Sequence, residues 1–296
     1  MNNNQRRAKA FTLIELAAVI TIIAILLSIV GKAVVTIKTS RLANARFLTN
    51  ASKITEINSL VAWYETSYIQ SFKADETQDQ DWLSIWNDIT PSSLASSPNK
   101  NALSRTASAN VVFEESGINK LPSVKFDGSV GANFTLGQID PAGSFDQATI
   151  FIVFRKLSNS TSIQNLLDSN SAGNDFSLGV GNDEVNFNAG TSVTTSTATN
   201  PASFAFNENV ILVAYFNGSF SRAFSNDATE IVGGSDLNIG LNNITGLTIG
   251  TDKNGASGFS GLVSEIIIFK EPLPKYLRKD ILNYLSNKYD IRVGNL

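Results

Sequence analysis

The hydrophobic positions change pattern three times along the chain, and the first pattern is one long apolar run. Residues 11–30 are apolar except for Thr12, Glu15, Thr21 and Ser28. A helix rises about 1.5 Å per residue, so a run of this length makes a rod of roughly 30 Å, the thickness of the hydrocarbon core of a bilayer. The pattern therefore predicts a helix that can span a membrane.

The helical pattern continues beyond this run. Residues 32–57 contain no Pro and no Gly. Apolar side chains recur there, and just after, at spacings of three or four residues: Phe47, Ala51, Ile54, Ile57 and Val61. Such spacing is typical of one face of an amphipathic helix. We expect one helix over residues 11–57 that lays this face on a globular head, with an independent linker helix as the alternative.

From about residue 58 the chain changes to short β-rich segments separated by clusters of Gly, Asn, Asp and Ser. The segments are 110–114, 123–126, 148–154, 176–180, 210–216, 247–249 and 262–269. No alternation of strands with helices is visible, which favours an antiparallel sandwich or barrel. Asn217 and Gly218 both accept positive φ, so they predict a two-residue hairpin turn between segments 210–216 and 219–224.

The last pattern is helical again. Pro274 stands near a helix start, and Leu277, Ile281, Tyr284 and Leu285 fall on one helical face. We expect a short closing helix within residues 272–289.

Charge adds a direction to the predicted membrane span. Arg6, Arg7 and Lys9 precede the apolar run, and the next basic residue is Lys32. Positive charges next to a span hold that side in the cytoplasm, so the part after residue 30 is expected to cross the membrane. The part after residue 30, which is expected to cross, holds 20 basic and 25 acidic residues, a net charge of −5.

The same pattern allows a second interpretation. A secretory signal also begins with basic residues and an apolar core, and its cleavage site lies among small residues after the core. Ser28, Gly31 and Ala33 loosely fit such a site. A carboxylate inside the core argues against this alternative, because a buried charge is costly in a bilayer.

Composition narrows the chemistry. The chain of 296 residues has no His and no Cys. This excludes conventional zinc, copper, haem and iron–sulfur sites, Ser-His-Asp and Cys-His nucleophiles, and disulfides. A net charge of −3 with no basic block beyond the first nine residues also argues against a nucleic-acid partner. The possibilities that remain are chemistry by carboxylate, lysine or tyrosine side chains, a cation bound by oxygen ligands, or no chemistry at all.

Glu15 is the one charged residue inside the apolar run. One explanation is that this side chain, about one turn into the run, reaches the lipid headgroups. The other is a positive partner at the same depth. A cut between Ala10 and Phe11 would create one, because it would leave a free α-ammonium four residues from Glu15.

The residues K-A-F-T-L-I-E-L around Phe11 closely resemble the prepilin N-terminal motif of type IV pilins and type II secretion pseudopilins. The resemblance implies a leader over residues 1–10, cleavage between Ala10 and Phe11 by a prepilin peptidase, and methylation of the Phe11 amine. It also implies that Glu15 neutralises the N-terminus of a neighbouring subunit during filament assembly. Two features depart from the family: Ala10 replaces the usual Gly, and no Pro stands near Lys32.

This resemblance also implies a place in the cell. The precursor is expected in the bacterial cytoplasmic (inner) membrane as a single-pass protein, with its N-terminus in the cytoplasm and its head exported. It then joins a periplasmic pseudopilus or a cell-surface pilus. The expected partners are the prepilin peptidase, the inner membrane, and other pilin or pseudopilin subunits.

Residues 58–296 form the expected head, and their motifs resemble the concanavalin A-like jelly roll in its laminin-G-like form. The motifs that carry this resemblance are residues 60–64, 86–88, 117–119, 121–128, 258–261, 264–269, 284–285 and 288–289. The resemblance implies an all-β antiparallel sandwich with a short C-terminal helix. The fold hosts lectins, adhesion modules and glycoside hydrolases, so it does not by itself assign a function.

The residue pattern argues against catalysis. Hydrolases of this fold carry two carboxylates on one strand, commonly as Glu-x-Asp-x-x-Glu, and no Glu-x-Asp occurs here. Glu265 stands alone on its predicted strand, and Asp183 and Glu184 would point to opposite faces of an extended segment. Gly179 and Gly181 indicate a turn at a strand end rather than a phosphate-binding loop. We expect no catalytic residues.

Binding residues are harder to assign, and the ligand-binding set stays unknown. Trp63, Trp82 and Trp86 are candidates for a sugar platform, although the core is the favoured place for them. Two pairs of oxygen donors are weak candidates for a calcium site, with ordinary turns as the favoured alternative: Asp252 with Asn254, and Asn226 with Asp227. No cofactor is expected beyond such a calcium ion.

Taken together, the sequence predicts a structural subunit of a filament or secretion pseudopilus. Its head would contact sister subunits or an external glycan or protein. The alternative is a membrane-anchored lectin-like or carbohydrate-active surface protein that does not polymerise.

Overall fold

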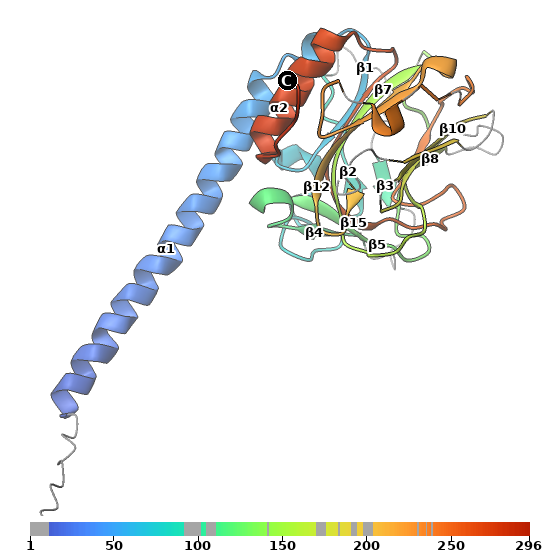
Figure 1. Ribbon diagram of the computed structural model, residues 1–296. Helices are drawn as coiled ribbons and strands as arrows, with labels where there is room; N and C mark the ends of the chain where they lie inside the picture. The colour runs from blue at the N-terminus through green and yellow to red at the C-terminus, as the bar shows by residue number, and fades with distance from the viewer. Residues whose placement is uncertain are drawn as a thin grey trace, which may run out of the picture. The chain divides into compact units, whose positions relative to one another are not determined.

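Figure 1 shows the computed structural model of the chain. It describes residues 12–91, 102–104, 111–140, 142–169, 176–182, 184–190, 194–197, 204–229, 231–234, 236–237 and 239–296. The chain divides into two compact units, Met1–Ala43 and Asn44–Leu296. Helix α1 (Leu13–Ala51) belongs to the first unit up to residue 43, and its last two turns belong to the second.

The first unit contains the predicted apolar helix. Within the described part of the chain, α1 is the one helix that is long and apolar enough to cross a membrane. Its large apolar side chains are exposed, from Leu13 to Val30. A helix that is apolar all round is stable only inside a protein core or a membrane, and no core covers this one. Its length and composition fit a bilayer span.

The second unit is an antiparallel β-sandwich, as expected. One sheet has the strand order β13-β12-β7-β15-β5-β4, with β1 paired to β15. The bounds of its strands are β1 (Leu60–Glu65), β4 (Val111–Glu114), β5 (Ser123–Asp127), β7 (Ala148–Lys156), β12 (Asn209–Phe216), β13 (Arg222–Ser225) and β15 (Ser260–Phe269). The long central strands of this sheet, β7 and β15, lie next to each other.

The other sheet has the strand order β11-β10-β9-β8-β14-β6-β3-β2. The bounds of its strands are β2 (Ile85–Trp86), β3 (Ala102–Ser104), β6 (Phe134–Leu136), β8 (Gln164–Ser169), β9 (Phe176–Val180), β10 (Glu184–Ala189), β11 (Thr194–Thr197) and β14 (Leu247–Ile249). All seven predicted segments overlap strands of the two sheets. The predicted segments leave out strands β1, β2, β3, β6, β8, β10 and β11. The shortest of these have too few residues to show an alternating pattern.

Two hydrophobic cores flank the first sheet. On β7, Ile150, Ile152 and Phe154 face the core between the sheets. Phe151 and Val153 face a second core, which is closed by α2 (Lys275–Tyr289) and by the end of α1. Because both faces of this sheet are covered, its central strands are continuously apolar instead of alternating.

Helix α2 confirms the predicted closing helix. Pro274 occupies its N-cap, and Ile281, Tyr284 and Leu285 are buried in the second core. The helix lies beside the last turns of α1 (Figure 1), and Ala45 and Leu48 of α1 pack into the same core.

The predicted face of the first helix is wrong. Phe47 is 66% exposed, whereas Ala45 and Thr49 are buried. Helix α1 ends at Ala51, before the expected residue 57, and a 3-10 turn follows over Ile54–Glu56. The regular spacing gave a wrong prediction because its apolar residues do not share one helix. They belong to α1, to this turn and to strand β1.

The predicted hairpin between β12 and β13 forms, but its two-residue turn is wrong. Tyr215 pairs with Arg222, and residues 217–221 connect the strands. Asn217 has a φ of −153°, and Gly218 opens a 3-10 turn over Gly218–Phe220. The Ser221 hydroxyl closes this wider loop, because it accepts the Asn217 N–H (2.9 Å) and donates to the Gly218 carbonyl (2.8 Å).

A buried ionic cluster joins the end of α1, the sheet and α2. Lys288 of α2 is completely buried, and its Nζ lies 2.5 Å from Glu65 Oε1 on β1 and 2.7 Å from Glu265 Oε2 on β15. The same ammonium donates to Thr49 Oγ1 of α1 at 2.9 Å. We call these four residues the Lys288 cluster.

Further donors surround both carboxylates. Glu265 accepts hydrogen bonds from Trp63 Nε1 (2.7 Å), Tyr284 OH (2.8 Å) and Tyr289 OH (2.9 Å). Glu65 accepts the backbone N–H groups of Ser67 (2.9 Å) and Tyr68 (2.8 Å). Every oxygen of the two carboxylates therefore has a partner, as buried charges require.

The cluster holds two carboxyl groups against one ammonium. Burial raises the pKa of Glu265, the ammonium of Lys288 opposes this, and the negative charge of Glu65 adds to the rise. The folded state therefore binds a proton at this group more tightly than the unfolded chain does.

We predict that Lys288→Met lowers the free energy of unfolding by about 3–5 kcal/mol, because it leaves two buried carboxyl groups without their cation. Lys270→Met is the matched control. Lys270 pairs with Asp140 at 2.7 Å but is 36% exposed, so its loss should cost less than about 1 kcal/mol. Denaturant titrations of the detergent-solubilised chain measure both values. Equal effects of the two substitutions would contradict the assignment.

Glu265 also predicts a pH dependence. Because the pKa of Glu265 is higher in the folded state, its protonated carboxyl stabilises the fold. This contribution to the free energy of unfolding is fully present below the pKa of the unfolded chain, about 4.3, and is lost as pH rises through the pKa of the folded state. Glu265→Gln cannot titrate, so we expect the stability of the natural chain relative to this variant to fall as pH rises above about 4.3. Unfolding free energies of both chains across this range provide the test. A difference that does not change with pH would refute it.

Candidate functional site

The N-terminal residues that the sequence singles out are described only in part. Ala10 and Phe11, the predicted cleavage pair, lie outside the described residues. Glu15 lies in the first turn of α1 and is exposed.

Glu15 takes part in a capping box with Thr12. Its Oε2 accepts the Thr12 N–H and the Thr12 hydroxyl, each at 2.9 Å. In return, the Glu15 N–H donates to Thr12 Oγ1 at 3.3 Å. This reciprocal arrangement satisfies donors at the start of a helix that would otherwise lack partners.

Our sequence interpretation missed this local role, although the pattern Thr-x-x-Glu directly before an apolar run was the signal for it. Glu15 thus has a use within its own helix as well as a predicted use toward a neighbouring subunit. The two uses differ in chemistry, because capping needs an acceptor whereas pairing with an ammonium needs a negative charge.

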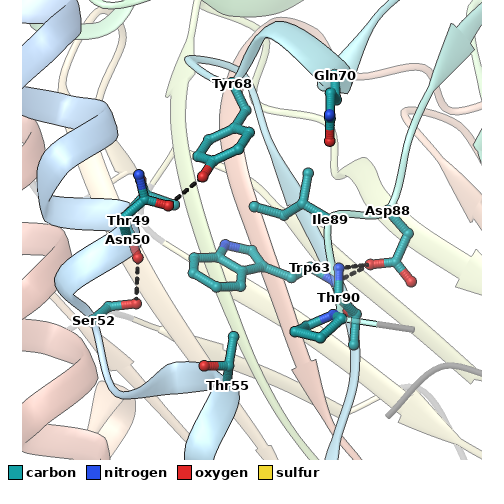
Figure 2. Close-up of a pocket in the computed structure, with 11 residues that line it drawn as sticks. Thr49, Asn50, Ser52, Thr55, Trp63, Tyr68, Gln70, Asp88, Ile89 and Thr90 are labelled. Carbon is teal, nitrogen blue, oxygen red and sulfur yellow. Dashed lines mark hydrogen bonds between the residues drawn. The ribbon is translucent and has the colours of Figure 1, made fainter. Parts of the chain in front are cut away.

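A pocket in the second unit is the candidate binding site. It has a volume of about 460 Å³ and lies where the end of α1 meets strand β1 and the loop after β2. Figure 2 shows its lining residues. They are Thr49, Asn50, Ser52, Thr55, Trp63, Tyr68, Gln70, Asp88, Ile89, Thr90 and Pro91.

Hydrogen bonds hold the polar walls of this pocket in place. Asp88 Oδ1 accepts the N–H groups of Trp63 and Thr90, both at 2.9 Å (Figure 2). On the facing wall, Tyr68 OH donates to Asn50 Oδ1. Both walls are therefore fixed by contacts within the second unit.

One wall carries an unsatisfied hydroxyl. Thr90 is 8% exposed, and its Oγ1 is buried without a hydrogen-bond partner. Buried polar groups of this kind are rare in folded proteins and call for an explanation.

The charges around the pocket limit its chemistry. Asp88 is the one ionisable acid among the lining residues, and no Lys or Arg lines the pocket. Glu65 and Glu265 are 0% and 1% exposed, and their oxygens are occupied within the Lys288 cluster. The lining residues therefore offer no pair of accessible carboxylates for glycoside hydrolysis, which needs two.

The candidate tryptophans divide between core and surface. Trp86 is fully buried, and its ring packs against Tyr64 and Phe72. Trp63 is 2% exposed and Trp82 is 36% exposed. The favoured core interpretation holds for Trp63 and Trp86, although Trp63 also lines the pocket.

The weak calcium candidates lie in turns. Asp252 Oδ1 accepts the N–H groups of Asn254 and Ala256, both at 2.8 Å. In the part of the chain that the structure describes, no three His, Cys, Asp or Glu side chains are grouped to hold a metal. Calcium binding at Asp252 and Asn254 stays a prediction.

Asn226 and Asp227 hold the C-terminus. Asn226 accepts the N–H of Gly294 at its carbonyl (2.8 Å), and Asp227 Oδ2 accepts Asn295 Nδ2 (2.8 Å). The backbone of Asn226 and the side chain of Asp227 thus connect the end of the chain to the β-sandwich.

The remaining candidates of the sequence have local roles. The N–H of Gly181 donates to the Glu184 carbonyl at 2.8 Å, which forms the predicted turn between β9 and β10. Gly179 of β9 pairs with Asn186 of β10, and Asp183 lies outside the described residues.

Fold and N-terminus together define a class of protein: a pilin-like N-terminal helix that carries a β-sandwich head. Comparison with protein families supports the first part, because residues 5–31 match the prokaryotic N-terminal methylation motif. This match includes Ala10, Phe11 and Glu15. No curated protein matches the chain in sequence.

Solved structures support the second part. The binding domain of Paraclostridial Mosquitocidal Protein 1 is similar with a TM-score of 0.54 and 11% identity, over 79% of this chain and 53% of that one. Trypanosoma rangeli sialidase in complex with sialic acid is similar with a TM-score of 0.53 and 15% identity, over 81% of this chain and 34% of that one. The chain thus spans about a third of the sialidase, and these likenesses show the fold alone.

Proposed function

We propose that the chain is a pilin or pseudopilin that assembles into a type IV pilus-like filament or a type II secretion pseudopilus. Prepilin peptidase removes residues 1–10, and the amine of Phe11 is methylated. The observation that carries this proposal is the match of residues 5–31 to the N-terminal methylation motif, a range that includes the exposed apolar start of α1.

Charge supports the proposed path through the cell. Basic residues before the span favour a cytoplasmic N-terminus in the inner membrane, and the head is then exported. From there the subunit enters a periplasmic pseudopilus or a surface pilus. Sister subunits are its partners in the filament, where Glu15 pairs with the N-terminal ammonium of a neighbour.

The head serves recognition or subunit contacts, and the proposal assigns it no catalysis. Two similar structures carry names that describe binding: the binding domain of a mosquitocidal protein, and a sialidase in complex with sialic acid. Their likeness lies in the fold, so it supports a glycan or protein ligand as a class and no particular one.

A second candidate is a membrane-anchored surface protein that never polymerises. The capping box of Thr12 and Glu15 favours it, because it gives the carboxylate a role that needs no neighbouring subunit. This candidate and the filament subunit differ in what the negative charge of Glu15 must do.

Processing of the N-terminus tests both candidates. We expect intact-mass and peptide mass spectrometry of the chain from its native membrane to find Phe11 as the first residue, with one added methyl group. An unprocessed chain, or one cut after Gly31 or Ala33, would defeat the pilin proposal.

Three substitutions separate the charge of Glu15 from its capping role. Glu15→Gln keeps an acceptor for Thr12 but removes the charge, Thr12→Val removes the capping hydroxyl but keeps the charge, and Glu15→Ala removes both functions. We expect Glu15→Gln and Glu15→Ala to lower the amount of subunit in sheared surface filaments at least tenfold. Thr12→Val should keep most of this amount.

The membrane level of each precursor, measured by immunoblot, is the control for expression. Normal assembly of Glu15→Gln together with failure of Thr12→Val would show that the residue acts by capping.

A further inference from the structure

The part of α1 that follows the apolar run carries positive charge only. Residues 31–43, which belong to the first unit, hold Lys32, Lys38 and Arg41 and no acidic residue. The sequence has no Asp or Glu at all between Glu15 and Glu56. We call residues 31–43 the basic segment.

The basic segment lies on the side of the span where positive charge is least expected. Basic residues normally mark the cytoplasmic flank of a span, whereas this segment lies on the flank that is proposed to be exported. There it weakens the charge difference that orients the chain in the membrane. An anionic partner at this level would explain why the charges are there.

Distance from the span limits what the basic segment can meet. A helix rises about 1.5 Å per residue, which puts Lys32, Lys38 and Arg41 about 3, 12 and 16 Å beyond Val30. The headgroup layer of a bilayer is roughly 5–7 Å thick on each side of the hydrocarbon core. Electrostatic attraction reaches about 8–10 Å further at physiological salt. All three residues therefore lie within reach of lipid headgroups.

The direction of helical side chains shortens this reach. In an α-helix each Cα–Cβ bond tilts toward the N-terminus, and the N-terminus of α1 is the end that enters the bilayer. Long Lys and Arg side chains near a membrane extend in this way until their charged ends reach the interface. A basic residue one or two turns beyond the span thus points its charge back toward the lipid.

The three basic residues surround the helix and do not share one face. Successive residues of a helix are about 100° apart, so Arg41 lies opposite Lys32 and about 60° from Lys38. A protein partner docks on one face of a helix, whereas headgroups surround a helix on all sides where it leaves the bilayer. The distribution of charge therefore favours lipid over protein as the partner.

The other side chains of the basic segment fit the same surroundings. Val35 and Ile37 are 61% and 54% exposed. Thr39 is satisfied within the helix, because its hydroxyl donates to the carbonyls of Val35 (3.1 Å) and Thr36 (3.0 Å). The interface of a bilayer accepts apolar and basic side chains together, with the apolar groups at the acyl boundary and the charges among the headgroups.

We infer that the basic segment binds the headgroups of anionic phospholipids in the outer leaflet of the membrane that α1 spans, through Lys32, Lys38 and Arg41. The inference goes beyond the proposed function and rests on the bilayer span alone, so it applies to an unassembled filament subunit and to a membrane-anchored protein alike. The head adds no attraction, because residues 54–296 hold 15 basic and 25 acidic residues, a net charge of −10.

Electron paramagnetic resonance of spin-labelled lipids around the full chain, reconstituted in phosphatidylcholine bilayers, tests the inference. The measured quantity is the association constant of phosphatidylglycerol relative to that of phosphatidylcholine. We expect the natural chain to prefer phosphatidylglycerol, and the triple variant Lys32→Gln, Lys38→Gln, Arg41→Gln to lower the ratio at least twofold. In 1 M NaCl the two chains should differ little, because salt screens the attraction.

A second triple variant is the matched control. Lys73→Gln, Lys120→Gln, Lys275→Gln removes the same charge from exposed positions of the head, so it should keep the ratio of the natural chain. Arg6, Arg7 and Lys9 remain in all three chains, and differences between the chains therefore exclude their contribution. Loss of basic residues from the exported flank does not oppose insertion, so the first variant should resist alkaline extraction like the natural chain.

An unchanged ratio in the first variant would overturn the inference, and so would an equal loss in the control. An unchanged ratio together with self-association of the detergent-solubilised chain that depends on the three residues would assign the basic segment to the acidic head of a second copy. The N-terminal mass of the same preparation keeps the proposals apart. A correctly processed chain without lipid preference refutes the lipid contact alone, and an unprocessed chain with that preference refutes the pilin proposal alone.

Discussion

The ion pairs of Lys288 are the interaction on which the rest of the head depends. One buried ammonium bridges two buried carboxylates on different strands and contacts the last turn of α1. Glu65 and Lys288 are 223 residues apart in the sequence, so the contact joins the first strand of the head to its last helix. Such a cluster contributes little net free energy when complete, but it is costly to break, and it thereby specifies one arrangement of its elements.

This arrangement replaces a covalent bond that the chain cannot form. Without Cys, no disulfide can fasten the C-terminal segment. Lys288 holds α2 against the sheet through its buried ion pairs. After α2, Gly294 and Asn295 donate hydrogen bonds to Asn226 and Asp227. The cluster also orients Trp63 and Thr49, which line the pocket, so the stability of the head and the shape of its candidate binding site have a common origin.

The sequence predicted the features whose pattern lies within one segment, and it missed the features that combine distant segments. The apolar helix, the seven β segments and the closing helix repeat one pattern over many residues, and all appear in the structure. The Lys288 cluster escaped prediction because its members stand far apart and because charged residues are normally exposed. Glu265 looked isolated for that reason. The pocket also combines distant segments, and the hydroxyl of Ser221 altered a turn that Asn217 and Gly218 alone would have made tighter.

Hydrogen exchange measured by mass spectrometry on the full chain in detergent tests the central claim most directly. If the Lys288 cluster joins the end of α1 to the head, amides of residues 44–51 should open with the same free energy as those of α2 and β15. Residues 44–51 that exchange as fast as an unsupported helix end, while α2 stays protected, would contradict the account.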